Sequence, residues 1–549
     1  MSSYSQGERD HWMFGNFAGV TFSTATPSGG TPNSSTHMEG VSNISSPTGD
    51  LLFYSNGIDV WDSDHNIMIN GTGLLGHETF SQGVSIIKKP LSEDIYFIIT
   101  LNFGPNFYSG EYLNLFYSEV DMSLNGGLGE VVNTSKNTPI RTSVDLKENN
   151  KIIQHANGYD YWLVVGSIDG TYLSYLITCE GISLTPVESA VGNPLTAPQP
   201  IGCMAANIEG TKIVSATGAF HPMEAFDFDA STGVLSNRID LPIISQDHYY
   251  GVEFSPNGEL VYATTGTLGP ALSTSLFQFN LSAGSPSDIA LSGTLIAISI
   301  QTNGSDGRFG QIAIGKDNKL YVADIGNDLC LIDSPNTVGT GCGFINAAID
   351  LSPRFSLAGL PNYPNKMPNP QLVPDTATTT FLNLCLDDGT QSFTSENEGG
   401  IWSGPGISDS ISGTFDPLIA GVGVHTIIYT INTPCSTFND SIIVDIDGCE
   451  SSGGNGNSSN ETVVLELPNV ITTNGDLIND IFQPVKIYGI DKMKTVIVNR
   501  WGNTLYESED KAILWDGSNS DDGVYFWTIE FTDVYGNADS KHGFVTVIN

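Results

Sequence analysis

The stretch Val252-Glu-Phe-Ser-Pro-Asn-Gly-Glu-Leu-Val-Tyr-Ala263 determines the fold that the sequence predicts. Apolar and aromatic residues occupy both of its ends, as in strands that are at least half buried. Between them stands Pro256-Asn257-Gly258, and the pair Asn-Gly favours a tight turn between antiparallel strands. The stretch therefore predicts a β-hairpin with a short turn.

The same unit recurs along the first two thirds of the chain. Its other copies span residues 41–54, 84–97, 152–165, 204–216 and 312–323. Their turns lie about 45 to 65 residues apart, which is the spacing of propeller blades with loop insertions. A blade cannot bury both of its faces alone, whereas radial stacking buries them against neighbouring blades. We therefore predict a β-propeller over residues 1–370.

Seven blades is the number we expect. The strands at Trp12–Gly15 and Gly19–Phe22 and the late segment Leu357–Pro361 are left over from the repeats. We expect them to share a composite seventh blade that joins the ends of the ring. Six or eight blades remain alternatives.

Two further β domains follow, so the expected fold class is all-β. Residues 371–449 are predicted to form an immunoglobulin-like sandwich, with Trp402 in its core. Residues 450–464 are rich in Ser, Gly and Asn, which is typical of a flexible linker. Residues 465–549 alternate apolar and polar residues between Gly, Asn and Asp turns, which predicts a small C-terminal β-sandwich.

Composition excludes some functions. Sixty acidic residues stand against twenty basic ones, for a formal net charge of −40. Such a chain repels nucleic-acid backbones, so we expect no nucleic-acid partner. No apolar run is long enough for a transmembrane helix. Residues 1–9 lack the apolar segment of a signal peptide, which leaves open whether one was removed.

Seven cysteines stand at Cys179, Cys203, Cys330, Cys342, Cys385, Cys435 and Cys449. None of them forms a Cys-x-x-Cys pair, so zinc and redox motifs are not expected. We predict two disulfides, Cys330–Cys342 and Cys385–Cys435, which suit an oxidising exterior. Cys179–Cys203 is a weaker pairing, and Cys449 is left over.

The end of the chain carries motifs that resemble a known family. They are Pro468-Asn-Val-Ile-Thr-Thr-Asn-Gly-Asp476, Asn499-Arg-Trp-Gly502 and Trp515-Asp-Gly517. In these motifs residues 465–549 resemble the gliding motility-associated C-terminal domain of Bacteroidetes, the type B sorting domain of type IX secretion cargo. The resemblance implies a domain that is recognised at the outer membrane and a chain that is delivered to the cell surface or the extracellular space.

The resemblance also implies partners, namely the type IX secretion machinery and a PorP/SprF-type outer-membrane barrel. The motif residues that it transfers to this chain are Pro468, Asn469, Asn474, Gly475, Asp476, Asn479, Asp480, Asn499, Arg500, Trp501, Gly502, Trp515, Asp516, Gly517, Asp522, Gly523 and Tyr525.

Two earlier regions resemble other parts of such proteins. Leu51–Trp61, Phe226–Gly233 and Gly251–Gly258 look like the propeller region often found ahead of this C-terminal domain. Gly400–Ile407 and Gly421–Thr430 resemble the Ig-like or PKD-like repeats of Bacteroidetes surface proteins. These resemblances imply architecture and surface location, and they bring no catalytic residues.

Two acidic loops of the last domain are candidate Ca²⁺ sites, because this cation takes about six to eight oxygen ligands. The candidate ligands are Asp476, Asn479, Asp480, Asp516 and Asp521. The alternative is that these residues only form turns. The type B family has Pro-Asn-Gly-Asp-Gly at the first loop, where this chain has Thr473 in place of the Pro and Leu477 in place of the second Gly. No cofactor is required in this interpretation.

Three functions are compatible with the sequence. The first is a non-enzymatic surface binding protein in adhesion or gliding, with a glycan or another surface polymer as a candidate ligand. The second is a polysaccharide-active enzyme, which needs carboxylates gathered in one channel. The third is a component of a phage or injection particle that carries bacterial surface modules. A propeller alone does not choose between binding and catalysis.

Overall fold

The structure is a computed structural model of the 549-residue chain. It describes all residues except 1–6, 25, 31–32, 37, 104–112, 145, 196–200, 217, 219–220, 244–247, 267–272, 301–304, 368–379, 396–399, 433–434, 436, 448–462, 473–480, 485, 512, 514, 518–519, 521–522, 535 and 549. The chain divides into two compact units, Met1–Cys449 and Glu450–Asn549, which we describe separately. None of the helices in the described residues has the length and apolar character needed to span a bilayer.

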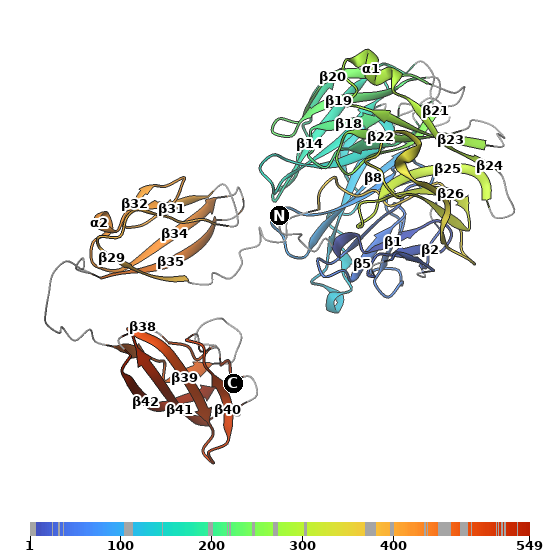
Figure 1. Cartoon of the computed structure of the whole chain (residues 1–549). Helices are drawn as coiled ribbons and strands as arrows, with labels where there is room; N and C mark the ends of the chain where they lie inside the picture. The colour runs from blue at the N-terminus through green and yellow to red at the C-terminus, as the bar shows by residue number, and fades with distance from the viewer. Residues whose placement is uncertain are drawn as a thin grey trace. The chain divides into compact units, whose positions relative to one another are not determined.

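The described residues of His11–Asp350 form seven antiparallel sheets (Figure 1). Sheet by sheet, their strands are β1 (His11–Phe14), β2 (Ala18–Thr21), β3 (Ser28–Gly29); β4 (Ser42–Ser45), β5 (Leu51–Ser55), β6 (Val60–Asp62); β7 (Val84–Lys88), β8 (Ile95–Phe103), β9 (Leu113–Asp121), β10 (Glu130–Val131), β11 (Thr138–Val144); β12 (Leu146–Gln154), β13 (Tyr161–Ser167), β14 (Thr171–Thr178), β15 (Gly181–Ile182), β16 (Val187–Ala190); β17 (Met204–Ala206), β18 (Lys212–Ser215), β19 (Met223–Asp229), β20 (Val234–Leu241); β21 (His248–Phe254), β22 (Leu260–Gly266), β23 (Ser273–Asn280), β24 (Thr294–Ile300); β25 (Ser305–Ile314), β26 (Leu320–Gly326), β27 (Asp328–Ile332) and β28 (Phe344–Asp350).

The predicted hairpins form these sheets. In the hairpin β21–β22, Val252 pairs with Ala263 and Phe254 pairs with Val261. The turn between the strands contains Gly258 at φ 72°, a left-handed conformation that glycine adopts without steric cost. The described residues of this region also contain the short helical segments η1 (Gly7–Arg9), η3 (Asn125–Gly127), α1 (Pro286–Leu291) and η4 (Gly339–Cys342).

The sheets form a β-propeller. Their first strands β1, β4, β7, β12, β17, β21 and β25 contact one another in that order, and β28 of the last sheet contacts β3 of the first. One apolar cluster contains Trp12 and Phe14 together with Ala313, Tyr321 and Ile349 from the last sheet. The ring is therefore closed by the packing of its first sheet against its last.

Three aromatic rings lie at this closure. The Trp12 ring centroid is 4.9 Å from that of Phe22 and 5.6 Å from that of Tyr321, which meets it edge to face. Edge-to-face pairs add to the free energy gained by burial alone. An ion pair between Lys316 Nζ and Asp10 Oδ1 at 2.6 Å also joins the last sheet to the segment before β1.

The prediction that Leu357–Pro361 belongs to a composite blade is wrong. Phe355 bridges to Asn16, but the residues after it form no strand with β1 or β2. Ala358 O accepts from the amide of Gln311 in β25, and the amide of Asn362 donates to Val41 O beside β4. Pro361 and Pro364 have no N–H group and cannot continue a sheet ladder. Residues 355–367, here named the closing segment, instead cross the first strands of several sheets.

A β-sandwich follows within the same unit. One sheet contains β29 (Thr380–Cys385), β35 (Thr437–Asp447), β34 (Gly423–Asn432) and β31 (Ile401–Ser403), and the other contains β30 (Gln391–Ser392), β33 (Thr414–Phe415) and β32 (Ile407–Asp409). Helix α2 (Pro417–Ala420) lies between β33 and β34. Trp402 is buried as predicted, with its ring 4.7 Å from Tyr429.

The second unit is a smaller β fold. Its five-stranded sheet has the order β37 (Val470–Thr472), β42 (Ala538–Ile548), β41 (Gly523–Asp533), β39 (Ile490–Val498), β40 (Thr504–Ser508), and β36 (Val464–Glu466) pairs with β38 (Lys486–Tyr488). Ile471, Phe482, Ile497, Ile529 and Val547 contribute to a core of its own.

Both predicted disulfides are wrong. Cys435 is bonded to Cys179, so the bond joins the propeller to the sandwich rather than closing the sandwich on itself. Cys385 is disulfide-bonded as well, but not to Cys435. Cys330 and Cys342 share one apolar cluster yet remain free thiols, and Cys330 Sγ donates to Asn346 Oδ1 at 3.2 Å. Cys203 is also free and buried, so it does not pair with Cys179.

Replacing Trp12 should open the ring. We expect Trp12→Ala to destabilise the propeller by about 3 to 5 kcal/mol, because it leaves a cavity between the first and last sheets. Thermal unfolding of the full chain measures the effect. Trp501→Ala is the matched control, because Trp501 is exposed in the second unit. Equal unfolding temperatures for Trp12→Ala and the wild type would contradict this account of closure.

Candidate functional site

The closing segment and the first strands enclose a polar centre in the propeller. Asn362 Nδ2 donates to Ser85 Oγ at 2.8 Å and to Asn150 O at 3.2 Å. Ser42 Oγ donates to Asn362 O at 3.1 Å, and Asn365 Oδ1 accepts from the amide of Gln154 at 2.8 Å. Side chains of β4 and β7 and backbone groups of β12 thus hold one segment. The sequence analysis missed these residues, although polar residues inside otherwise apolar strands are the signal that could have indicated them.

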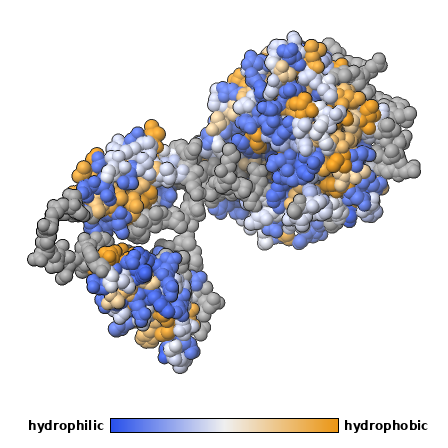
Figure 2. Space-filling view, in the orientation of Figure 1, coloured by the Kyte–Doolittle hydropathy of each residue, from blue (hydrophilic) through white to orange (hydrophobic). Residues whose placement is uncertain are grey.

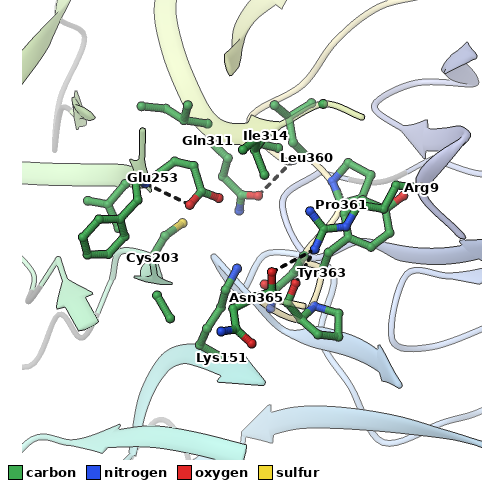
Figure 3. A pocket seen from close by; sticks show the side chains of 18 of the residues that line it. Arg9, Lys151, Cys203, Glu253, Gln311, Ile314, Leu360, Pro361, Tyr363 and Asn365 are labelled. Atoms are coloured by element: carbon green, nitrogen blue, oxygen red, sulfur yellow. Dashed lines mark hydrogen bonds between the residues drawn. The ribbon is translucent and has the colours of Figure 1, made fainter. Parts of the chain in front are cut away.

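A cavity of about 90 Å³ lies beside the closing segment (Figure 3). Its polar lining includes Arg9, Lys151, Cys203, Glu253, Gln311 and Asn365. Figure 3 shows the side chains of Lys151, Cys203, Glu253 and Gln311 directed toward the same space. These residues come from β12, the start of β17, β21 and β25, so four sheets build one cavity.

Arg9 anchors the start of the chain to the closing segment. Its Nη2 atom donates to Pro364 O at 2.6 Å, and its guanidinium carbon lies 5.3 Å from the centroid of the Tyr363 ring. Its Nε atom is buried and has no hydrogen-bond partner among the described residues. The Nη2 atom of this guanidinium is therefore hydrogen-bonded, whereas its Nε atom is not.

Lys151 and Glu253 bring opposite charges to the cavity. Burial lowers the pKa of Lys151, and the charge of Glu253 opposes this shift. Burial raises the pKa of Glu253, and the charge of Lys151 opposes that shift in turn. Glu253 Oε1 accepts from the amide of Phe254 at 2.9 Å. No direct ion pair joins the two side chains in the described part of the chain.

Two further carboxyl groups, those of Glu39 and Glu148, lie near the beginning of first strands. Glu39 precedes β4, and Glu148 stands near the start of β12. Burial raises the pKa of Glu39 to about 7. Burial, followed by the charge of Glu39, raises the pKa of Glu148 to about 8. Glu148 therefore holds its proton at neutral pH in the folded chain and would release it on unfolding.

Two aromatic residues of β13 are packed inside the propeller. Tyr161 and Trp162 are buried in β13, and Trp162 Nε1 donates to Ala230 O at 2.9 Å. These rings stabilise contacts between sheets and provide no open platform for a sugar.

The predicted sorting motif divides into core, turn and exposed residues. Trp515 and Tyr525 are buried with ring centroids 5.4 Å apart. Asn499 Oδ1 accepts from the amide of Trp501 at 3.1 Å in the turn between β39 and β40. Trp501 itself is 75 % exposed. Arg500 and Gly502 share this turn, Pro468 and Asn469 precede β37, Asp516 and Gly517 follow Trp515, and Gly523 begins β41.

The candidate Ca²⁺ loops cannot be placed. Asn474, Gly475, Asp476, Asn479, Asp480, Asp521 and Asp522 lie outside the described residues. Asp516 is described and exposed. Within the described ranges, no group of three acidic, His or Cys side chains is arranged to hold a metal ion.

The second unit exposes one apolar face. Val524, Phe526 and Phe544 are about half exposed, and Phe526 pairs with Phe544 across β41 and β42. Strand alternation places these residues opposite buried Tyr525 and Val545. Figure 2 shows hydrophobic residues interspersed with hydrophilic ones on the visible surface. We name Val524, Phe526 and Phe544 the apolar face.

Glu148 gives a pH-dependent prediction. Because its pKa is raised on folding, the stability it contributes is complete below about pH 4.5 and is lost as the pH rises to about 8. Glu148→Gln should therefore raise the unfolding temperature at pH 8 by several degrees and change it little at pH 5. Thermal unfolding of the full chain at both values checks this, with exposed Glu259→Gln as the control. A Glu148→Gln effect that is equal at the two pH values would refute the assignment.

Comparison with solved structures finds propellers. A structure from Bacteroides uniformis described as a candidate 6-phosphogluconolactonase is 12 % identical, covers 62 % of this chain and 97 % of its own, and has a TM-score of 0.38. The Myceliophteria thermophila Cps50 (Swd1) β-propeller domain is 13 % identical, covers 57 % and 92 %, and has a TM-score of 0.33. The Dos1 propeller is 11 % identical, covers 62 % and 79 %, and has a TM-score of 0.34. At these identities the similarity concerns the fold and carries no activity to this chain.

No curated protein sequence matches the chain significantly. The family model of the CHU_C type IX secretion signal domain matches residues 465–547, which comprise most of the described second unit. The match covers the strands β36 to β42 and both the buried and the exposed motif residues. Residues 465–547 are therefore a type IX secretion signal domain, which implies export of this chain by the type IX secretion system to the cell surface or the extracellular space.

Proposed function

We propose that this chain is an exported binding protein of the cell surface, in which the propeller carries the ligand-binding part and the signal domain provides delivery. The observation that carries the proposal is the signal domain itself, which has its own core and forms a compact unit separate from Met1–Cys449. A domain of this kind keeps its fold without the rest of the chain. Delivery and binding are thus assigned to different parts of the molecule.

The partner of the signal domain in this proposal is the secretion machinery, with a PorP/SprF-type outer-membrane barrel as the attachment point. Support comes from the apolar face, because exposed apolar patches on a soluble domain commonly mark interaction sites. A role in adhesion or gliding follows from surface delivery. The proposal includes no catalytic residue and no required cofactor.

Removal of the signal domain tests delivery. We expect a chain that lacks residues 465–549 to stay inside the cell, because the element recognised by the export system is gone. Cell fractionation and immunoblotting against the propeller measure the exported fraction. Protease resistance of the retained propeller is the control for folding. Export of the truncated chain at the wild-type level would defeat the proposal.

Substitutions on the apolar face test the docking surface. Phe526→Ser combined with Phe544→Ser should reduce the exported fraction several-fold and leave the unfolding temperature of the second unit nearly unchanged, because both side chains are about half exposed. Val534→Ser is the control, since Val534 is exposed in the turn after β41. Wild-type export of the double variant would exclude this face as the docking surface.

A second function is favoured by one observation. Glu39, Glu148 and Glu253 bring three carboxyl groups to the centre of the propeller, and burial raises the pKa of all three. A polysaccharide-active enzyme uses a protonated carboxylic acid beside a carboxylate. In this alternative Glu148 is the general acid. Release of reducing ends from surface polysaccharides by the wild type, and its loss in Glu148→Gln, would favour the enzyme over the binding protein.

A further inference from the structure

Lys151 places an ammonium group inside the propeller without a bonded partner. Its side chain is 5 % exposed, and Nζ forms no hydrogen bond or ion pair with any residue that the structure describes. Figure 3 shows this side chain directed into the cavity beside the closing segment. A buried ammonium is costly in free energy unless another group compensates its charge.

The charge of the cavity is opposite to that of the chain. Arg9, Lys151 and Lys316 line it, and Glu253 is the one acidic residue among its described lining residues. Lys316 is paired with Asp10, which leaves Arg9 and Lys151 facing a single carboxylate. The whole chain has 60 acidic and 20 basic residues, so a cavity with an excess of cations is a local exception. This charge balance favours an anion.

The volume of the cavity limits the ligand. A cavity measured in this way needs about 10 to 15 Å³ to hold one water, so a cavity of about 90 Å³ has room for several waters or for a small anion. The Lys151 ammonium and the Glu253 carboxylate are charged groups available to a ligand, whereas Gln311 is engaged by the amide of Leu360.

We propose that this cavity binds a small oxyanion that also carries a hydroxyl group, such as a hydroxycarboxylate or hydrogen phosphate. The charged oxygens of the anion accept hydrogen bonds from Lys151 Nζ, and Arg9 adds its positive charge from the closing-segment side. The hydroxyl group donates to the carboxylate of Glu253. The bound anion compensates the charge of Lys151 and links β12, β21 and the start of the chain.

This inference goes beyond the proposed function, because the ligand site lies in the propeller and does not depend on the signal domain. A failed binding experiment on the purified chain would leave the export experiments unaffected. The two proposals can therefore fail separately.

Isothermal titration calorimetry on the purified full chain tests the site. The probes are glycolate, inorganic phosphate and acetate, with chloride as the reference anion. We expect binding of glycolate or phosphate with one site per chain and a higher unfolding temperature in their presence. Tighter binding of glycolate identifies a hydroxycarboxylate site, and tighter binding of phosphate identifies a phosphate site. The proposal is overturned if none of the three probes binds more tightly than chloride, and no result with a variant changes that outcome.

Variants assign the binding to the cavity. Lys151→Met should weaken binding at least about tenfold. The unfolding temperature of the free variant is measured alongside, because Lys151 also offsets the buried charge of Glu253. Lys212→Met is the matched control, since Lys212 lies on β18 and is substantially exposed. Unchanged affinity in Lys151→Met overturns the site.

The Glu253→Gln variant tests the hydroxyl contact. The wild type should prefer glycolate over acetate, and this preference should fall several-fold in the variant because the amide oxygen is a weaker acceptor than a carboxylate. An unchanged preference overturns the role of Glu253.

Discussion

Closure of the ring is the constraint on which the rest of the propeller depends. Each sheet is a small twisted ribbon with apolar residues on both faces, and water must be excluded from both. Packing each sheet between two neighbours achieves this everywhere except at the ends of the series. There the aromatic contacts of Trp12 with Phe22 and Tyr321 join the first sheet to the last. Without that contact two sheets would expose an apolar face.

The centre of the ring is organised differently from the interfaces between sheets. Polar side chains and backbone groups of the first strands hold the closing segment through its backbone and through the side chains of Asn362 and Asn365. Buried polar groups are stable when each has a partner, and most of these do. Burial also shifts the pKa of Lys151 and of the carboxyls of Glu39, Glu148 and Glu253. These buried titratable groups therefore lie near the first strands and the closing segment.

The second unit separates delivery from the propeller. Its motif residues serve two structural purposes, because Trp515 and Tyr525 fill the core while Trp501 and Phe544 remain exposed. A family signature that mixes core and surface residues preserves both a fold and a surface. Both kinds of residue lie within the part of the chain that matches the family model.

The sequence by itself determined the features that arise from neighbouring residues. The Asn-Gly turn of the hairpin around Gly258, the all-β class, the burial of Trp402 and the motifs of the signal domain all follow from local turn chemistry and strand alternation. Only the tertiary structure decided which distant segments meet. It set the path of residues 355–367 across the first strands and the bond between Cys179 and Cys435. It also brought Arg9, Lys151 and Glu253 together at one cavity. All three features depend on contacts between residues far apart in the chain. Local patterns do not encode such contacts, because turn chemistry and strand alternation report only on residues that are near one another in the chain.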